Sequence, residues 1–335
     1  MEKRQGTGLG KFFRLAVLLG VALVSGGALF PNTTLARDLM PWKSPNHALV
    51  IDAYELNIID WDAMLKDKRI AGFISKASDG LPEVYNCSGA HNGDTAAHCK
   101  TMWRKYVVSR ELSQTRRMLA KAHGLLWGAY HLARPGNPID QANHFLDYAA
   151  PSADEMMVLD LEGLDTSEFM SLEDAEIFAR HIKARTGRYP VLYTNHITAR
   201  HIAVNRETFR LLSRLPLWYA RYKPEIKGVF PMGNWDNYML WQFATASNCG
   251  KKSCPMRIAG TLDDIDVNTV PMNAKALAAI WARGELVEER APELQHLVIA
   301  SGTLGTSAIP SPPAQARAFM RRRPTEVTAL NYQDF

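Results

Sequence analysis

The chain has 335 residues, enough for one large domain or two ordinary ones, and its 47% hydrophobic content is typical of a globular protein with a sizeable core. This composition excludes an intrinsically disordered chain. The formal net charge of +5 arises largely in the first 36 residues, where four basic residues and one acidic residue give +3, so the charge makes no case for a nucleic-acid partner.

The N-terminus has the three-part pattern of a secretory signal. A basic stretch precedes an apolar run from Leu15 to Phe30, and Thr34-Leu35-Ala36 supplies the small residues of a cleavage site. The run is interrupted by glycines and is shorter than the roughly 20 apolar residues that a membrane-spanning helix needs. We therefore expect residues 1–36 to be a signal peptide and the protein to be periplasmic or secreted, with an uncleaved membrane anchor as the alternative.

Strand-like apolar runs recur along the chain, and the earlier ones alternate with segments of helical periodicity. The expected strands are 48–54, 71–78, 125–133, 156–162, 190–195, 217–222, 238–244 and 263–268. The expected helices are 60–68, 110–123, 139–149, 171–186, 199–213 and 274–283. This order predicts an α/β fold, a modified (β/α)8 TIM-like barrel over residues 42–285, and the alternative is an open doubly wound sheet.

Three segments are expected to depart from a regular barrel. The last three strands have no helix between them, so this side should be irregular or partly antiparallel. Residues 81–104 form an expected inserted loop after the second strand. Residues 286–335 lack a core pattern and predict a disordered tail.

The four cysteines form two local pairs. In an exported protein this predicts two disulfides, Cys87 with Cys99 and Cys249 with Cys254. Zinc binding is the alternative use of four cysteines, although the two spacings do not match each other.

The segment from Glu155 to Gly163 is an apolar run that ends in two carboxylates, Asp160 and Glu162. Side chains alternate faces along a strand, so these two should point the same way. Two neighbouring carboxyl groups have pKa values that are pushed apart, which lets one donate a proton while the other stays anionic. Cleavage of a glycosidic bond requires this division of roles. The alternative is an ordinary acidic turn after a strand.

Polar and aromatic residues also occur at the carboxyl ends of the other expected strands. Because these ends meet at one rim of a barrel, we expect the residues to lie together. Carboxylates beside aromatic rings suit a sugar, which has flat apolar faces edged with hydroxyls. The candidate substrate-binding residues are Asp52, Lys76, Tyr130, Tyr193, Trp218, Tyr219, Trp241, Gln242 and Asp266. The alternatives are core packing for the tryptophans, an ion pair for Lys76 and backbone hydrogen bonds for Gln242.

Eight short motifs, one for each expected strand, resemble those of the glycoside hydrolase family 25 lysozymes, in order over residues 47–275. They are Val50-Ile51-Asp52, Phe73-Ile74-Ser75-Lys76-Ala77-Ser78-Asp79-Gly80, Gly128-Ala129-Tyr130-His131, Leu159-Asp160-Leu161-Glu162, Pro190-Val191-Leu192-Tyr193-Thr194-Asn195, Leu217-Trp218-Tyr219-Ala220, Leu240-Trp241-Gln242 and Ile265-Asp266-Val267-Asn268. The resemblance implies an N-acetylmuramidase that cleaves the β-1,4 bond between N-acetylmuramic acid and N-acetylglucosamine in peptidoglycan, without a metal or cofactor.

The resemblance also implies roles for individual residues. Glu162 would be the general acid, with a raised pKa, and Asp160 its ionised partner, which either orients the acetamido group of the muramic acid for attack or stabilises the cationic sugar. Asp52 and Asp266 match the family's other rim acids, and Tyr130 matches its active-site tyrosine. Asp79 stands where the family more often has Glu, and the 81–104 insertion is unusually long, so both bear on substrate range.

The expected partner is the peptidoglycan glycan strand, which the protein should bind as a monomer, with membrane contact only through an uncleaved N-terminus. Two other functions remain open at this point. One is a metal-dependent hydrolase built on Asp52, His131, Asp160, Glu162 and His196. The other is a barrel that binds glycan without catalysis.

Overall fold

The structure is a computed structural model that describes residues 39–81 and 109–291. The expected signal peptide, the Cys87–Cys99 disulfide and most of both the inserted loop and the tail lie outside these residues. None of the helices in the described ranges is long and apolar enough to cross a membrane.

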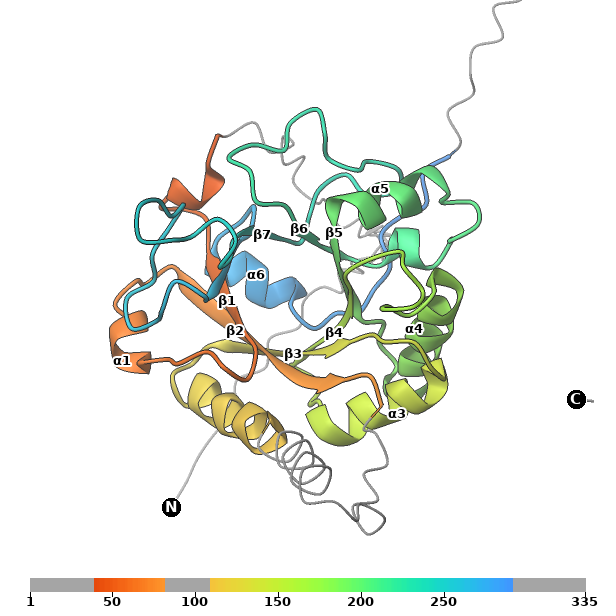
Figure 1. The fold of residues 1–335 in the computed structure, drawn as a ribbon, viewed down its shortest axis with the longest axis horizontal. Coiled ribbons are helices and arrows are strands. Elements are labelled where there is room, and N and C mark those ends of the chain that lie inside the picture. The colour runs from red at the N-terminus through yellow and green to blue at the C-terminus, as the bar shows by residue number, and fades with distance from the viewer. Residues whose placement is uncertain (1–38, 82–108, 292–335) are drawn as a thin grey trace, which may run out of the picture. The chain divides into compact units, whose positions relative to one another are not determined.

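Eight strands form a closed barrel in which each strand pairs with the next one along the chain (Figure 1). They are β1 (Leu49–Ala53), β2 (Ile70–Asp79), β3 (Leu126–Leu132), β4 (Met156–Leu161), β5 (Val191–Asn195), β6 (Leu217–Ala220), β7 (Leu240–Ala244) and β8 (Asp266–Thr269). Strands β1 to β7 are parallel, whereas β8 runs antiparallel to both β7 and β1. The predicted modified barrel is confirmed, including its partly antiparallel last side, and the open sheet is wrong.

Helices cover the outside of the barrel and close one end of it (Figure 1). They are α1 (Trp61–Met64), a helix that includes residues 109–122, α3 (Pro138–Ala149), α4 (Leu172–Thr186), α5 (His196–Val204) and α6 (Ala274–Ile280), with short 3-10 turns η1 (Pro41–Lys43) and η3 (Leu212–Arg214).

The expected helix over 199–213 is wrong in its bounds. Helix α5 starts immediately after β5 because the side chain of Asn195 accepts a hydrogen bond from the Thr198 amide and caps the helix. The helix ends at Val204, and only the short turn η3 follows before β6.

The beginning of the expected tail is still attached to the barrel. The Val287 amide donates to the Arg214 carbonyl at 2.8 Å, and the Arg290 amide donates to the Asn234 side chain at 3.0 Å. Residues 287–290 therefore make ordered contacts with the domain.

Alternation along each strand divides the core into two layers. One set of side chains fills the barrel interior, among them Val50, Val158 and Leu240, while their neighbours face the helices. The amino-terminal end of the barrel is closed by Trp281, which is buried and donates from Nε1 to the Trp127 carbonyl at 2.7 Å. Polar groups can therefore gather only at the carboxyl end of the strands.

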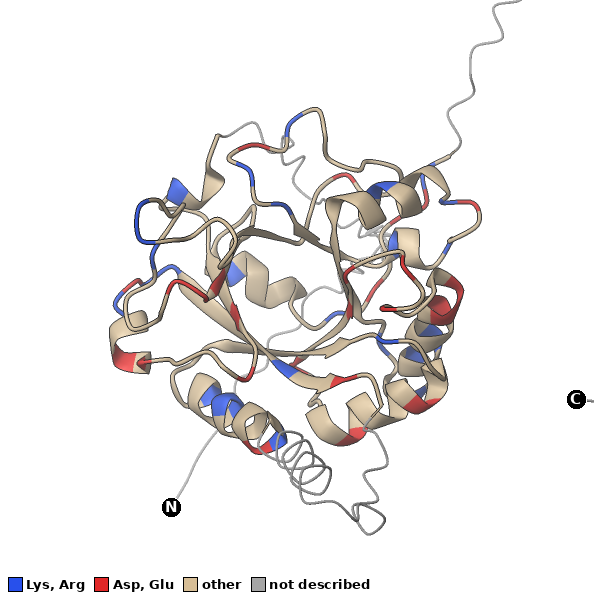
Figure 2. Ribbon diagram, viewed as in Figure 1, with Lys and Arg blue, Asp and Glu red and all other residues tan. Residues whose placement is uncertain are grey.

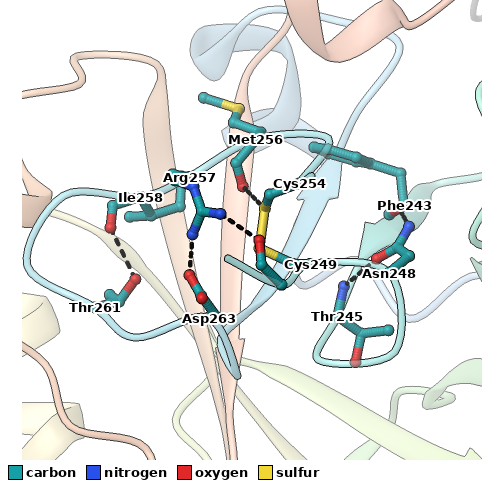
Figure 3. Close-up of a disulfide and its surroundings, with 11 residues drawn as sticks. Phe243, Thr245, Asn248, Cys249, Cys254, Met256, Arg257, Ile258, Thr261 and Asp263 are labelled. Carbon is teal, nitrogen blue, oxygen red and sulfur yellow. Dashed lines mark hydrogen bonds and ion pairs between the residues drawn. A yellow bond between two sulfur atoms is a disulfide. The ribbon is translucent and has the colours of Figure 1, made fainter. Parts of the chain in front are cut away.

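The loop between β7 and β8 contains the predicted disulfide between Cys249 and Cys254, which is confirmed (Figure 3). The Arg257 guanidinium in the same loop bonds to the Asp263 carboxylate and the Gly250 carbonyl. The loop is thus fixed to itself between two strands that carry Gln242 and Asp266.

We expect the double substitution Cys249→Ser/Cys254→Ser to lower the free energy of unfolding by about 2 kcal/mol, because the disulfide closes a loop of only five positions. Urea unfolding of the variant and of the oxidised wild type measures this difference. Equal stability of the variant and the oxidised wild type would show that this disulfide adds nothing.

Candidate active site

Asp52 lies inside the barrel at the carboxyl end of β1, two positions after the interior residue Val50. Its carboxylate accepts hydrogen bonds from Asn268 Nδ2 at 2.6 Å and from Gln242 Nε2 at 3.2 Å. Burial raises the pKa of Asp52 to about 6, an increase that these hydrogen bonds oppose and that the charge of Glu162 enhances. Asp52 is therefore only partly ionised in a mildly acidic medium.

Asp266 faces Asp52 across the β1–β8 pair. Burial raises the pKa of Asp266 to about 8, with a second contribution from Asp52, and a hydrogen bond with Thr245 opposes the increase. Among the described residues, its buried Oδ1 atom has no hydrogen-bond partner. This carboxyl group is positioned to bond to something outside the chain.

Asp160 is an interior residue of β4 and is only 6% exposed. Burial raises its pKa well above the usual range, and the negative charges of Glu162 and Asp52 add to the increase, while Lys76 opposes it. Its Oδ1 atom is buried and lacks a hydrogen-bond partner within the described ranges. Burial and the neighbouring carboxylates therefore both favour the neutral form of Asp160.

Glu162 directly follows β4, and its backbone carbonyl accepts a hydrogen bond from the Asn195 side chain. The residue is exposed, yet protein atoms around the carboxyl group remove part of its hydration, which raises its pKa, and the Arg134 charge opposes the increase. The charge of Glu162 adds to the raised pKa of Asp160. The expected division of roles, an ionised Asp160 beside a protonated Glu162, stays a prediction.

Lys76, on β2, forms an ion pair with Glu55 at 2.7 Å and a longer one with Asp79 at 3.6 Å. Asp79 in turn accepts from Arg134 Nε at 2.8 Å. Lys76 is therefore held in an ion-pair network at the rim, which was the alternative to a substrate contact. Sequence reasoning missed Glu55 and Arg134, although each follows the end of a strand by two residues and could have been found from that position.

Two tyrosines and one glutamine form a hydrogen-bonded group beside Asp52. The hydroxyls of Tyr193 and Tyr222 donate to Gln242 Oε1 at 2.9 and 2.7 Å, and the Gln242 amide nitrogen donates to Asp52. Tyr130 lies in the same interior, where burial and the nearby Asp160 raise its pKa far above the usual value. Both Tyr130 and Tyr193 are thus neutral hydrogen-bonding groups next to the acids.

Three of the expected sugar-binding aromatic residues have packing roles instead. Trp218 is 1% exposed and donates to Asn268 Oδ1 at 2.5 Å inside the barrel. Tyr219 and Trp241 face the outer layer and are both 0% exposed, the first against Phe230 and the second beside Trp42. With no exposed ring surface, these side chains cannot stack on a sugar in this structure. Alternation explains the outward pair, because each is one position away from an interior residue.

His131 also points away from the acids. Its ring lies 2.8 Å from the Ser78 hydroxyl and 3.0 Å from Gln141 Oε1, and it stacks on Phe178 in the outer layer. Burial lowers its pKa to about 4. The metal site imagined around His131 is therefore not assembled, and the described part of the chain contains no group of three or more His, Cys, Asp or Glu side chains placed to hold a metal ion.

A buried arginine forms hydrogen bonds to the loop that follows β1 at the rim. Arg116, in the helix over 109–122, is 4% exposed and donates to the carbonyls of Tyr54 at 2.8 Å and Asn57 at 2.6 Å. It also reaches the Ser75 hydroxyl at 3.3 Å. This side chain fixes the loop that carries Glu55 to the neighbouring strand β2.

Acidic positions gather around the open end of the barrel, as the red segments on its strands and the following loops show (Figure 2). Two cavities occur away from this rim. One of about 590 Å³ lies at the opposite end of the barrel next to His123 and Ala274, and one of about 410 Å³ lies beside α5. The candidate site is defined by its buried carboxyl groups, because neither cavity contains a comparable cluster.

The structure shows a closed α/β barrel with buried acids at the carboxyl ends of its strands, and comparison with known families adds a reaction class. Residues 104–251 match the family described as Glycosyl hydrolases family 25. This region of the chain is therefore similar to a family of glycoside hydrolases, the same family that the sequence motifs resemble. No curated protein matches the chain.

Several solved structures are similar to this chain. A muramidase from Acremonium alcalophilum is 22% identical, with 71% of this chain and 100% of that chain covered and a TM-score of 0.48. A family GH25 lysozyme from Aspergillus fumigatus is 18% identical, with 70% and 99% covered and a TM-score of 0.48. A bacterial lysozyme from Streptomyces coelicolor is 20% identical, with 72% and 100% covered and a TM-score of 0.45. Values this low do not themselves establish a shared function.

Proposed function

We propose that this protein is a peptidoglycan muramidase, a lysozyme that cleaves the β-1,4 bond between N-acetylmuramic acid and N-acetylglucosamine. The observation that carries the proposal is the group of four carboxyls at one end of the barrel, Asp52, Asp160, Glu162 and Asp266, all with raised pKa values. The family domain supports the reaction class. Such perturbed acids are typical of catalytic sites.

Glu162 is the better general acid of the central pair. Its side chain is exposed and can reach a glycosidic oxygen, whereas Asp160 lies deeper in the barrel. A bound sugar excludes water from Glu162, which raises its pKa further and keeps its proton available for the leaving oxygen.

Asp160 acts on the sugar that becomes cationic. Its unpartnered Oδ1 atom can bond to the acetamido group and orient it for attack on the anomeric carbon, or the ionised group can stabilise the positive charge directly. Asp52 and Asp266 line the same opening, and the tyrosines beside them supply neutral hydrogen bonds to sugar hydroxyls.

The proposal includes export by the predicted signal, action as a monomer and contact with membrane only through an uncleaved N-terminus.

Purified peptidoglycan incubated with the protein should release soluble muropeptides, and borohydride reduction of the products should give muramitol, because the muramic acid becomes the new reducing end.

Glucosaminitol in place of muramitol would contradict the bond assignment. Binding without product release would favour the glycan-binding barrel, and activity lost with a chelator and restored by zinc would favour the metal-dependent hydrolase.

A further inference from the structure

A second polar cavity opens beside α5, between this helix and the loop over residues 228–233. Gly233 in that loop has a φ of +69°, and a Cβ atom there would lie 3.1 Å from Ala203 Cβ and 3.2 Å from the Ala203 carbonyl oxygen. Glycine therefore lets the loop pack directly on the helix. The cavity has a volume of about 410 Å³ and a wall of defined shape.

Both basic and apolar residues line this cavity. The basic ones are His196, Arg200 and Arg206, and the apolar ones include Val204 and Val229. Both valines are exposed, at 75% and 42% of their surface. The one Arg of α5 gives this helix a blue segment (Figure 2).

The two arginines are only weakly neutralised by carboxylates, since Arg200 has no ion pair in the described ranges and Arg206 has one long pair with Glu207. Arg200 is exposed and makes no hydrogen bond or ion pair with any residue in the described ranges. The Nε atom of Arg206 is buried without a hydrogen-bond partner there, and its nearest carboxylate, Glu207 Oε1, is 3.9 Å away. A third arginine, Arg221, is near enough to His196 for its charge to act on that ring. The positive charge of the pocket is therefore available to an anionic ligand.

The pocket and the candidate active site are linked through neighbouring residues of the chain. His196 follows Asn195, whose side chain donates to the backbone carbonyl of Glu162. The ring of His196 is held in place by the Tyr219 hydroxyl, 2.7 Å from its Nδ1 atom. A group bound in the pocket can thus belong to the same molecule that is cleaved at Glu162.

We propose that this pocket binds the acidic peptide attached to the muramic acid of the substrate, with peptide carboxylates on Arg200 and Arg206 and alanine methyl groups on Val204 and Val229. The inference rests on the proposed muramidase function. A peptide rises about 3.3 Å for each extended residue, so a stem of about four residues matches the roughly 13 Å length of the nine-residue helix α5. Guanidinium groups bind carboxylates through paired hydrogen bonds, which suits an acidic stem.

The test compares two glycans, intact peptidoglycan and the same glycan strands after an amidase has removed the stems. The double variant Arg200→Gln/Arg206→Gln should raise KM for the intact substrate by about fivefold or more, with kcat nearly unchanged and no effect on the stripped strands. The matched control is Lys66→Gln/Lys68→Gln, which removes two positive charges at the opposite end of the barrel and should alter neither substrate.

A direct measurement of binding separates the pocket from catalysis. In the inactive Glu162→Gln background, calorimetry with a disaccharide tetrapeptide should show weaker binding when both arginines are replaced, whereas the bare disaccharide should bind equally. If replacing the arginines weakened binding of both ligands equally, the proposal would be overturned. A polyphosphate is tested as an unrelated anion, and a variant that binds it more weakly but binds the disaccharide tetrapeptide as wild type does would also overturn the proposal. If wild type cleaves neither glycan, the muramidase function fails, whereas cleavage of both with unaffected variants refutes only the peptide pocket.

Discussion

Replacing Glu162 by Gln should reduce turnover of peptidoglycan by about 10³-fold, because the amide cannot donate a proton to the leaving oxygen. The side chain is exposed and no described residue bonds to its carboxyl group, so the fold should be unaffected. Release of reducing ends from purified peptidoglycan measures the rate, and co-sedimentation with the insoluble polymer should show that binding is retained.

The matched control for this variant is Glu168→Gln, the same chemical change at another exposed position after β4. It should have wild-type activity, since its side chain is away from the buried acids. Wild-type activity of the Glu162 variant would remove the assignment of the general acid. Loss of activity accompanied by a lower melting temperature would instead mean that Glu162 supports the fold.

The period of two along each strand accounts for most of what could be predicted at the site. Because interior residues recur at every second position, placing Val50 and Val158 inside is enough to place Asp52 and Asp160 inside as well. The same rule places Tyr219 and Trp241 outside, and applying it to each strand would have removed both from the expected sugar contacts.

Other features depend on contacts between distant segments and could not be predicted from the sequence. The ion pair of Glu55 with Lys76 and the bonds of Arg116 to the loop after β1 depend on how the strands and helices meet. The depth of the two central carboxyl groups also could not be predicted from their spacing of two residues, since Asp160 is buried inside the barrel and Glu162 is exposed after β4.

The buried acids reduce the stability of the fold as well as forming its site. A carboxyl group whose pKa is higher in the folded protein binds more protons there than in the unfolded chain, so the free energy of unfolding falls as pH rises between the two values. For Asp266 this window extends from the ordinary value of 3.8 to about 8. Below it the group is protonated in both states, and above it the folded protein contains a buried, poorly bonded charge.

Replacing Asp266 by Asn should therefore stabilise the protein by about 5 kcal/mol at pH 8.5 and by less than about 1 kcal/mol at pH 4, because the amide carries no charge at either pH. Urea unfolding at the two pH values measures the difference. The exposed control Asp147→Asn, on α3, should show little change at both. An equal gain at pH 4 would assign the effect to packing, and a loss at pH 8.5 would show that the Asp266 charge is stabilised in the fold. The same variant should be less active on peptidoglycan, because it lacks a carboxyl group at the opening of the barrel. Higher stability would then be accompanied by lower activity.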